Sequence, residues 1–275
     1  MMPFSSLRPR LGQHFLTDPA VAPLMVRALK LKRGDTVVEI GPGKGALTLP
    51  LLAGCESAGC RIVAIEKDSL LAKNLVHRCA DRNQSLAVVR EDALTAIPEL
   101  VQRFIREQIP YMLTGNIPYY ITGRLLRIIS ELPILPARAV FTVQREVAER
   151  IAARPPRMNL LAATVQFWGI PMIIRRLPRT AFIPPPRVES AVITIEPAAP
   201  RIVLSSTYYR FVKALFAHPR KTIRNNLVAS PLLAKGEKTA LLELLREGSL
   251  AGNGRPSEIP LPVLINLASR LEAKL

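Results

Sequence analysis

A short segment near the middle of the chain, Gly115-Asn116-Ile117-Pro118-Tyr119-Tyr120, combines a side-chain amide, a proline turn and two aromatic rings. These residue types suit the transfer of a methyl group to the exocyclic amine of adenine. That amine is a poor nucleophile, because its lone pair is delocalised into the ring. The Asn116 side-chain oxygen and the Ile117 carbonyl, aimed at the two amine hydrogens, would favour a pyramidal nitrogen with its lone pair facing the methyl group. Positioning would then do most of the remaining work.

The proline and tyrosines of this segment fit the same chemistry. Pro118 stiffens the turn, and Tyr119 offers a flat face on which a base can stack once it has left its own stack. Aromatic residues make up only 5% of the chain, so two adjacent tyrosines at this position suggest a specific role. Taken alone, the segment is more often an ordinary Asn-x-Pro turn followed by buried tyrosines.

A glycine-rich loop, Glu39-Ile40-Gly41-Pro42-Gly43-Lys44-Gly45-Ala46, follows an apolar run and precedes an expected helix. Glycines at such a turn let the backbone approach a nucleotide-like ligand closely. Gly41, Gly43 and Ala46 also satisfy the dinucleotide fingerprint, and Glu66 after the next run could hold the ribose of either kind of cofactor. The loop alone therefore indicates a methyl donor or a nicotinamide or flavin cofactor, with a tight turn that binds nothing as the remaining alternative.

Asp92 favours the methyl donor. It closes the third apolar run, at the edge of the sheet where ligands of open α/β folds bind. A carboxylate there can accept a hydrogen bond from the adenine amine of the donor, although a helix N-cap is the simpler explanation of its position. The glycine loop, Glu66, Asp92 and the Asn116 segment follow one another in the order that such a donor site requires.

The elements that must position these residues are short apolar runs that alternate with helical stretches. Such alternation predicts an α/β fold with a mostly parallel, doubly wound sheet. Two further runs have no helix between them, which predicts an antiparallel hairpin at one edge. The parallel runs are 36–40, 62–66, 86–89, 111–114 and 139–143, and the edge pair is 172–174 with 191–195.

The pattern changes near Pro197–Pro200, after which no strand alternation is evident. We expect helices over 207–217, 219–229, 239–247 and 260–272, and hence two domains: a catalytic domain at 1–200 that binds the donor and a small helical RNA-binding domain at 201–275. Residues 201–275 hold 12 Lys or Arg against 5 Asp or Glu, so both parts are basic. A positively charged cleft between them would suit a nucleic-acid strand.

The net charge of +17 and the pI near 10.6 call for a polyanionic partner. Nucleic acid is the commonest such partner, and an anionic membrane surface is the rival. No apolar run approaches the roughly 18 residues of a spanning helix, and the N-terminus lacks a signal-peptide stretch, so we expect a cytoplasmic protein. Cys55, Cys60 and Cys79 are odd in number and lack Cys-x-x-Cys spacing, which predicts neither a metal site nor a disulfide framework.

With these motifs in this order, the sequence resembles the bacterial small-subunit (16S) ribosomal RNA adenine dimethyltransferases. The resemblance runs from Leu11 to about Leu227 and is highly specific in combination. It is carried by Leu11-Gly12-Gln13-His14-Phe15-Leu16, the loop 39–43, Glu66, Asp92, the segment 115–119, Gln144-Arg145-Glu146-Val147, residues 182–192 and Arg220-Lys221-Thr222-Ile223-Arg224-Asn225-Asn226-Leu227.

The resemblance implies a Rossmann-like class I methyltransferase fold and S-adenosylmethionine as cofactor, with two adjacent adenines near the 3′ end of 16S rRNA as target and a role in subunit biogenesis. We also expect no metal and a monomer, although the sequence does not reveal the oligomeric state. The implied cofactor-binding residues are His14, Leu16, Gly41, Gly43, Glu66, Asp92 and Asn116. The implied target-base residues are Asn116, Ile117, Pro118 and Tyr119, with Phe182 on the other face of the base.

Two positions depart from commoner members of that family. His14 stands where many have Asn, and Tyr120 where many have Asn or His, which leaves the fine substrate geometry open. Arg220, Lys221 and Arg224 would share one face at the start of the helix 219–229 and contact the RNA backbone.

Four other functions remain to be weighed. A relative that dimethylates 23S rRNA and confers antibiotic resistance shares the catalytic core, and a non-enzymatic RNA-binding assembly or transcription factor shares the fold. A DNA adenine methyltransferase usually has Pro-Pro-Tyr where this chain has Ile117-Pro118-Tyr119. A nicotinamide oxidoreductase needs a hydride-transfer site, and none of the three histidines sits at a convincing strand end.

Overall fold

The protein is described by a computed structural model that covers residues 14–82, 85–198, 206–247 and 252–274. Contacts divide these residues into two compact units. The first unit comprises the described residues up to Leu125, Pro136–Arg145 and Ile174–Thr194; the second comprises Leu126–Leu135, Glu146–Ile173 and the described residues from Ile195 onward. The division at residue 200 into a donor-binding and an RNA-binding domain stays a prediction.

A seven-stranded sheet has the order β4-β3-β2-β5-β6-β9-β7, and the neighbours from β4 to β6 are parallel. This order confirms the predicted mostly parallel sheet with an antiparallel edge. Central strands buried on both faces need near-continuous apolar sequence, which is why each predicted run lies in a strand. The strands are β2 (Thr36–Ile40), β3 (Arg61–Ile65), β4 (Leu86–Val89), β5 (Tyr111–Asn116), β6 (Arg138–Gln144), β7 (Gly169–Leu177) and β9 (Ser190–Pro197).

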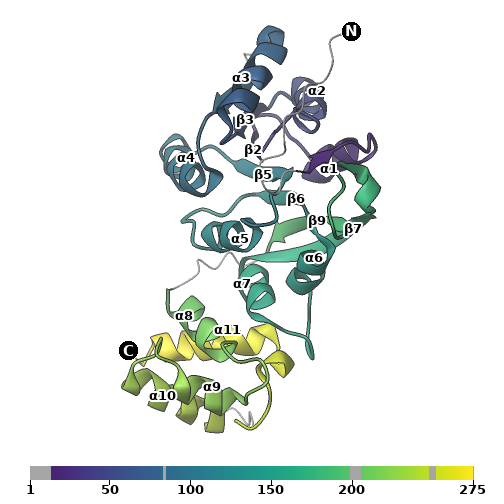
Figure 1. The fold of residues 1–275 in the computed structure, drawn as a ribbon. Coiled ribbons are helices and arrows are strands. Elements are labelled where there is room, and N and C mark those ends of the chain that lie inside the picture. The colour runs from purple at the N-terminus through teal and green to yellow at the C-terminus, as the bar shows by residue number, and fades with distance from the viewer. Residues whose placement is uncertain (1–13, 83–84, 199–205, 248–251, 275) are drawn as a thin grey trace. The chain divides into compact units, whose positions relative to one another are not determined.

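Helices flank these strands, with α1 and α4 on opposite sides of the strand layer in Figure 1. Side-chain caps start two of them: Asp68 accepts from the amides of Leu70 and Leu71, and Asp92 accepts from Leu94. The helices up to residue 151 are α1 (Val21–Leu29), α2 (Thr48–Ala58), α3 (Ser69–Arg78), α4 (Ala93–Glu107), α5 (Thr122–Ser130) and α6 (Arg145–Ile151), with short 3₁₀ turns at Ala80–Arg82 and Arg179–Ala181.

The second unit is built from helices packed around α11, which contacts α7, α8 and α10. A buried tyrosine joins two of them, because the Tyr208 hydroxyl donates to the carbonyl of Ala163 at 2.9 Å. These helices are α7 (Leu160–Trp168), α8 (Ser206–Leu215), α9 (Ile223–Ala229), α10 (Lys235–Glu247) and α11 (Leu261–Glu272), with a 3₁₀ turn at Pro256–Glu258. All four helices predicted after residue 200 are present, but the one predicted at 219–229 begins only at Ile223.

That late start corrects one prediction. Arg220 and Lys221 lie in the turn before α9, whereas Arg224 lies within it, so the three cations do not share a helical face. The physical reason is Thr222, whose extended backbone and side-chain bond to the Asn225 amide make it the N-cap.

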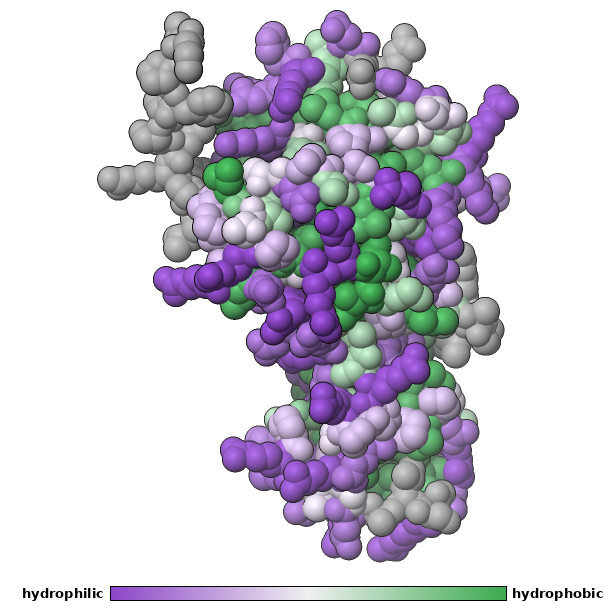
Figure 2. All heavy atoms as spheres, turned by 90° about the vertical axis from the view of Figure 1, so that its right-hand side faces the viewer, coloured by the Kyte–Doolittle hydropathy of each residue, from purple (hydrophilic) through white to green (hydrophobic). Residues whose placement is uncertain are grey.

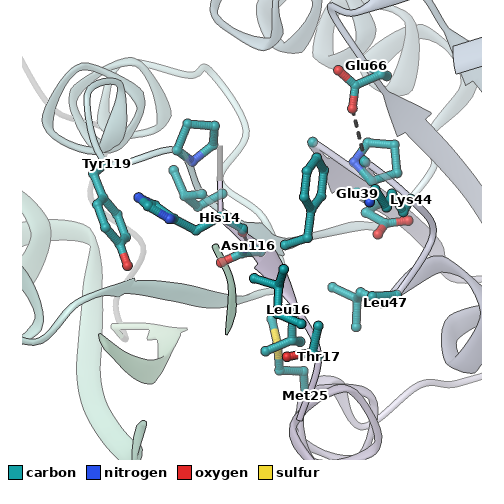
Figure 3. Close-up of a pocket in the computed structure, with 18 residues that line it drawn as sticks. His14, Leu16, Thr17, Met25, Glu39, Lys44, Leu47, Glu66, Asn116 and Tyr119 are labelled. Atoms are coloured by element: carbon teal, nitrogen blue, oxygen red, sulfur yellow. Dashed lines mark hydrogen bonds between the residues drawn. The ribbon is translucent and has the colours of Figure 1, made fainter. Parts of the chain in front are cut away.

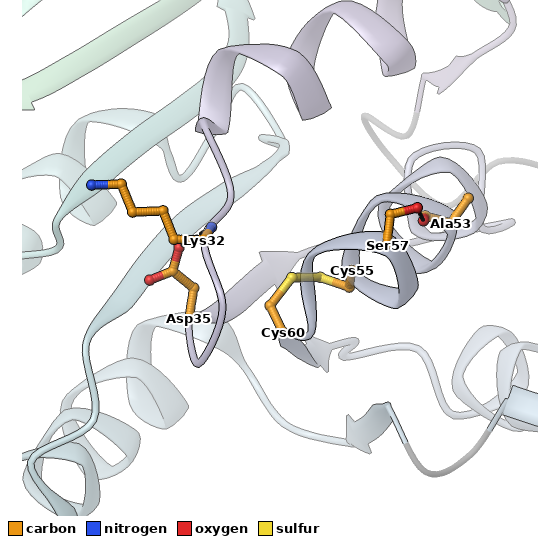
Figure 4. The surroundings of a disulfide bond; sticks show 6 residues. All are labelled: Lys32, Asp35, Ala53, Cys55, Ser57 and Cys60. Atoms are coloured by element: carbon orange, nitrogen blue, oxygen red, sulfur yellow. Dashed lines mark hydrogen bonds between the residues drawn. A yellow bond between two sulfur atoms is a disulfide. The ribbon is translucent and has the colours of Figure 1, made fainter.

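The cysteines bring a second correction, since Cys55 and Cys60 form a disulfide (Figure 4). Gly59 caps the C-terminus of α2, and its left-handed conformation turns the chain back on the last helical turn. The amides of Gly59 and Cys60 both donate to the Cys55 carbonyl, and the two Cα atoms come within 4.7 Å. The prediction of no disulfide was wrong because spacing alone does not reveal this reversal. Cys79 is buried elsewhere.

The sheet ends at β7, on the side that faces the viewer in Figure 2, where hydrophobic side chains lie among hydrophilic ones. Ile170 and Met172 on β7 are more than half exposed. Arg175 and Arg176 near the end of the strand add charge, a common way to keep an edge strand from pairing with other chains. Of the helices in the described ranges, none has the length and apolar character needed to cross a membrane.

The strand order reverses between β2 and β5, so their carboxyl ends open the crevice in which ligands of such sheets bind. Gly115 makes this junction possible. A Cβ atom at that position would lie 2.3 Å from the carbonyl oxygen of Ile40, well inside contact distance. Only glycine lets the end of β5 approach the end of β2 this closely.

We expect Gly115→Ala to lower the free energy of unfolding by at least about 2 kcal/mol, because the backbone must move to accept the new methyl group. Denaturant unfolding measures this change. Gly123→Ala is the matched control, since a Cβ there meets nothing within 4 Å, and its stability should stay within about 0.5 kcal/mol of the parent. Equal stabilities for the two variants would contradict the tight approach of β2 and β5.

Candidate active site

A cavity of about 420 Å³ opens where β2 and β5 end. Three segments far apart in sequence line it: the N-terminal residues 14–17, the glycine loop after β2 and the Asn116 segment after β5. Figure 3 shows Glu39 and Glu66 on the side of the glycine loop, His14 and Tyr119 on the opposite side, and Asn116 between them. The structure thus brings together residues that the sequence singled out separately.

The N-terminal wall is held by a two-stranded sheet of β1 (Phe15–Leu16) with β8 (Phe182–Ile183). His14 extends this pairing, because its Nδ1 donates to the Pro184 carbonyl at 2.8 Å. Leu16 lines the same cavity. The preceding motif residues Leu11, Gly12 and Gln13 lie outside the described residues.

The amide of Asn116 has a defined orientation. Its Nδ2 donates to the His14 carbonyl at 2.8 Å, so its Oδ1 is the atom left to accept. The amide of Ile117 donates to the Thr142 carbonyl at 3.1 Å, which fixes the next peptide plane. Among the hydrogen bonds of the described residues, none uses Asn116 Oδ1 or the Ile117 carbonyl as acceptor. Two unused acceptors therefore lie side by side in sequence, on residues that line the cavity.

Tyr119 also lines the cavity and is half-buried. Its hydroxyl lies 2.7 Å from Oγ of Ser190, the first residue of β9, and its ring centroid lies 5.7 Å from that of His14. Burial raises the pKa of the Tyr119 hydroxyl, and the Ser190 hydrogen bond opposes this effect. The ring is thus fixed at both ends as part of the cavity wall, a geometry suited to stacking.

The glycine loop is held by Glu66. Its carboxylate accepts from the amide of Gly43 at 3.0 Å, the bond drawn in Figure 3. It also accepts from the amide of Asp68 at 2.9 Å. Gly43 has a positive φ of 57°, and a Cβ there would lie 3.2 Å from the Phe15 ring. The loop, the acidic end of β3 and the N-terminal strand are therefore in direct contact around the cavity.

A second cavity of about 320 Å³ shares Gly41, Glu66 and Pro118 with the first. Asp92 lines it and has two roles at once: it caps α4 and forms an ion pair with Lys67 at 2.9 Å. Partial burial raises the pKa of Asp92, but the hydrogen bonds from Leu94 and Lys67 and the Lys67 charge outweigh it, so this pKa lies below its usual range. The N-cap explanation and the binding explanation are compatible. Tyr120, at 72% exposure, stands at the rim.

Phe182 is 1% exposed within the core, whereas its neighbour Ile183 is 62% exposed and lines the cavity, because successive residues of a strand point to opposite faces.

The cations Arg220, Lys221 and Arg224 are exposed on the second unit. Among the described residues, no cluster of three His, Cys, Asp or Glu side chains could hold a metal ion.

Sequence reasoning missed the most unusual group of the site, Glu39. It is 1% exposed and lines the cavity, and its Oε2 has no hydrogen-bond partner among the described residues. Burial, with a contribution from the Glu66 charge, raises the pKa of Glu39 to about 8. Burial likewise raises the pKa of Glu66. An acidic residue in the middle of an apolar strand is the signal that could have marked Glu39.

The matching family model is described as ribosomal RNA adenine dimethylase, and it covers residues 4–254. The chain belongs to this family. A ribosomal RNA small subunit methyltransferase A from Dehalococcoides mccartyi (strain CBDB1) is 36% identical over 238 residues, which make up 86% of this chain and 79% of that relative. The predicted class of enzyme, a methyltransferase acting on ribosomal RNA adenine, is confirmed.

Solved structures support the fold independently. A dimethyladenosine transferase from Plasmodium falciparum superposes with a TM-score of 0.77 at 22% identity and covers 95% of this chain and 98% of that chain. The 23S rRNA methyltransferase ErmE superposes with a TM-score of 0.69 at 23% identity and covers 94% and 99%. At these identities the likeness concerns the fold, and it confirms the predicted Rossmann-like methyltransferase architecture.

Glu39 predicts a pH dependence of stability. Because its folded pKa of about 8 lies above the ordinary 4.5, the unfolded state loses the proton first as pH rises. The free energy of unfolding should therefore fall between pH 5 and pH 8, by up to about 1.4 kcal/mol per pH unit. Glu39→Gln should lack this fall, so its stability relative to the parent should increase across the same range by at most about 4 kcal/mol.

Urea unfolding at pH 5, 6, 7 and 8 measures the effect. Glu99→Gln, at an exposed position of α4, is the matched control and should follow the parent at every pH. A Glu39→Gln difference that does not change with pH would show that Glu39 is ionised in the folded protein throughout.

Proposed function

We propose that this chain is an S-adenosylmethionine-dependent enzyme that dimethylates the exocyclic amines of two adjacent adenines near the 3′ end of 16S rRNA, within the small ribosomal subunit. One observation carries the proposal: Asn116 Oδ1 and the Ile117 carbonyl are oriented acceptors without partners among the described residues, on the wall of a cavity. A primary aromatic amine has two hydrogens for two such acceptors.

The residues present fit the proposed cofactor. S-adenosylmethionine is a cationic nucleoside that supplies an electrophilic methyl group on sulfur. Glu39 Oε2, which is buried and has no partner among the described residues, would accept from its ammonium group, and Glu66, directly after β3, would hold its ribose. Asp92 lines the adjoining cavity, where its carboxylate could accept from the donor's adenine amine. His14, Leu16, Gly41 and Gly43 complete the proposed donor site.

The chain's own residues would act on the target base. Tyr119 would stack on the flipped adenine, while Asn116 and Ile117 hold its amine pyramidal. With the amine held in this way, its nitrogen lone pair would face the methyl group that S-adenosylmethionine would supply, and the amine would become cationic on accepting it. It then loses a proton to water, so no dedicated base is needed. Pro118 keeps the turn rigid. If the amine were hydrated or displaced, its alignment with the methyl group would be lost and the reaction would slow.

The resemblance puts Phe182 on the other face of the target base, but its side chain is 1% exposed and packs on the core side of β8. We propose instead that it anchors β8 and so positions Ile183 at the cavity wall. The target base would then be held between Tyr119 on one face and aliphatic surface on the other.

The small subunit is favoured as substrate by the D. mccartyi relative, whose name specifies it and which matches 86% of this chain. The 23S alternative is supported by ErmE only at the level of the fold. A purely RNA-binding role would leave the two acceptors of Asn116 and Ile117 without use. We further propose that residues 201–275 bind RNA through exposed cations, among them Arg220, Lys221 and Arg224, in keeping with the net charge of +17.

Asn116→Ala should reduce kcat by a factor of about 10² or more, comparable to the loss of one preorganised hydrogen-bonding group in other enzymes. RNA affinity should stay within about twofold of the parent, because the flipped base is the only part of the RNA that Asn116 would contact. The assay uses small subunits that lack the modification, labelled S-adenosylmethionine, and mass spectrometry of the released nucleosides, with dimethyladenosine as the expected product. Asn225→Ala, the same change at an exposed position of α9, is the control and should remain active. Methyl transfer to DNA alone, or to large subunits only, would overturn the proposal.

A further inference from the structure

The turn before α9, which we define as residues 218–222, is held in shape by one buried side chain from within that helix. Asn226 is 1% exposed. Its Oδ1 accepts from the His218 amide at 2.9 Å, and its Nδ2 faces the carbonyls of His218 at 3.0 Å, Lys221 at 3.2 Å and Thr222 at 3.1 Å. One amide group thus closes both ends of the turn. Within the turn the Lys221 amide donates to the His218 carbonyl at 2.9 Å, and the Asn226 side chain adds partners for the other buried backbone groups.

The turn and the start of α9 carry cations that form no salt bridge with other described residues. Arg220 and Lys221 are exposed, and Arg224 follows in the first turn of α9. No Asp or Glu occurs between Ala217 and Ser230. Among the salt bridges of the described residues, none involves these three cations. Their charge is therefore available to an anionic partner.

The other side of the turn is fixed as well. The amides of Ile223 and Arg224 donate to the carbonyls of Gly254 and Gly252, each at 3.0 Å. The backbone that carries the three cations is thus tied down on both sides, by Asn226 and by the segment 252–254. A rigid backbone lowers the entropy cost of placing several cations against a phosphate chain at once.

We infer that Asn226 is a positioning residue for RNA binding: it preforms the turn 218–222 so that Arg220 and Lys221 meet successive phosphates of the substrate RNA. This inference rests on the proposed function, which makes RNA the partner. It concerns the sugar-phosphate backbone, because exposed cations on a turn position a nucleic acid without reading its sequence. Asn226 itself is buried and touches no RNA.

The neighbouring Asn225 is the natural control. It has the same side chain and lies one position earlier on the same short helix, but it is exposed, and its recorded bond uses only its backbone amide. A comparison of the two asparagines separates the loss of an amide side chain from the loss of the turn geometry.

The test measures binding to unmodified small ribosomal subunits across a range of salt concentrations. Asn226→Ala should weaken binding about tenfold near 0.15 M salt and lower the slope of log K against log salt by one to two, because each lost phosphate contact lowers it by roughly one. Asn225→Ala should leave affinity and slope unchanged. Methyl transfer by Asn226→Ala should show a raised KM for subunits with kcat unchanged, a split that general loss of folded protein would not produce.

A double-mutant cycle tests whether Asn226 acts through the cations. Arg220→Ala with Lys221→Ala should lower the salt slope by about two. Adding Asn226→Ala to that pair should cause no further loss beyond twofold. A full tenfold additional loss, or an unchanged slope in Asn226→Ala, would overturn the inference. If Asn226→Ala fails to fold, Asn226→Gln, which keeps the amide but shifts it by one methylene, replaces it in the same cycle with the same expected slopes.

Failure of this inference is distinguishable from failure of the proposed function. If subunits bind with the expected slopes and cycle but receive no methyl groups, the proposed function fails and the role of Asn226 stands. If dimethyladenosine forms while the slope does not depend on Asn226, Arg220 and Lys221, the proposed function stands and the role of Asn226 is refuted.

Discussion

One hydrogen bond, from Asn116 Nδ2 to the His14 carbonyl, connects residues 102 positions apart and sets the chemistry of the cavity. It orients the amide so that Oδ1 is the acceptor, and it fastens the N-terminal strand across the end of β5. His14 in turn is fixed to Pro184. The group that would polarise the target amine and the wall that would enclose the donor are therefore positioned together, so neither can shift without the other.

The sheet makes that bond possible. At the reversal of strand order, Gly115 lets the ends of β2 and β5 approach closely, and the glycine loop and the Asn116 segment consequently face one cavity. The same burial makes Glu39 costly for folding, since its pKa is raised and its Oε2 has no partner among the described residues. The proposed cationic donor would supply that partner.

Sequence patterns predicted the elements whose cause is local. The apolar runs became the buried strands, and Asp92 became the helix cap that its position indicated. Features set by the path of the backbone were missed. The disulfide depends on the reversal at Gly59, and the late start of α9 depends on Thr222. Phe182 and Ile183 are both apolar, so only the pairing of β8 with β1 determines which of them reaches the cavity.

The bond between Cys55 and Cys60 is enclosed by the protein: the two residues are 0% and 5% exposed. A reductant in solution can reach the disulfide only when the end of α2 and the start of β3 unfold locally. This local unfolding has its own free energy. The lifetime of the bond in a reducing cell would then be governed by how often that helix end frays, and much less by the abundance of small thiols.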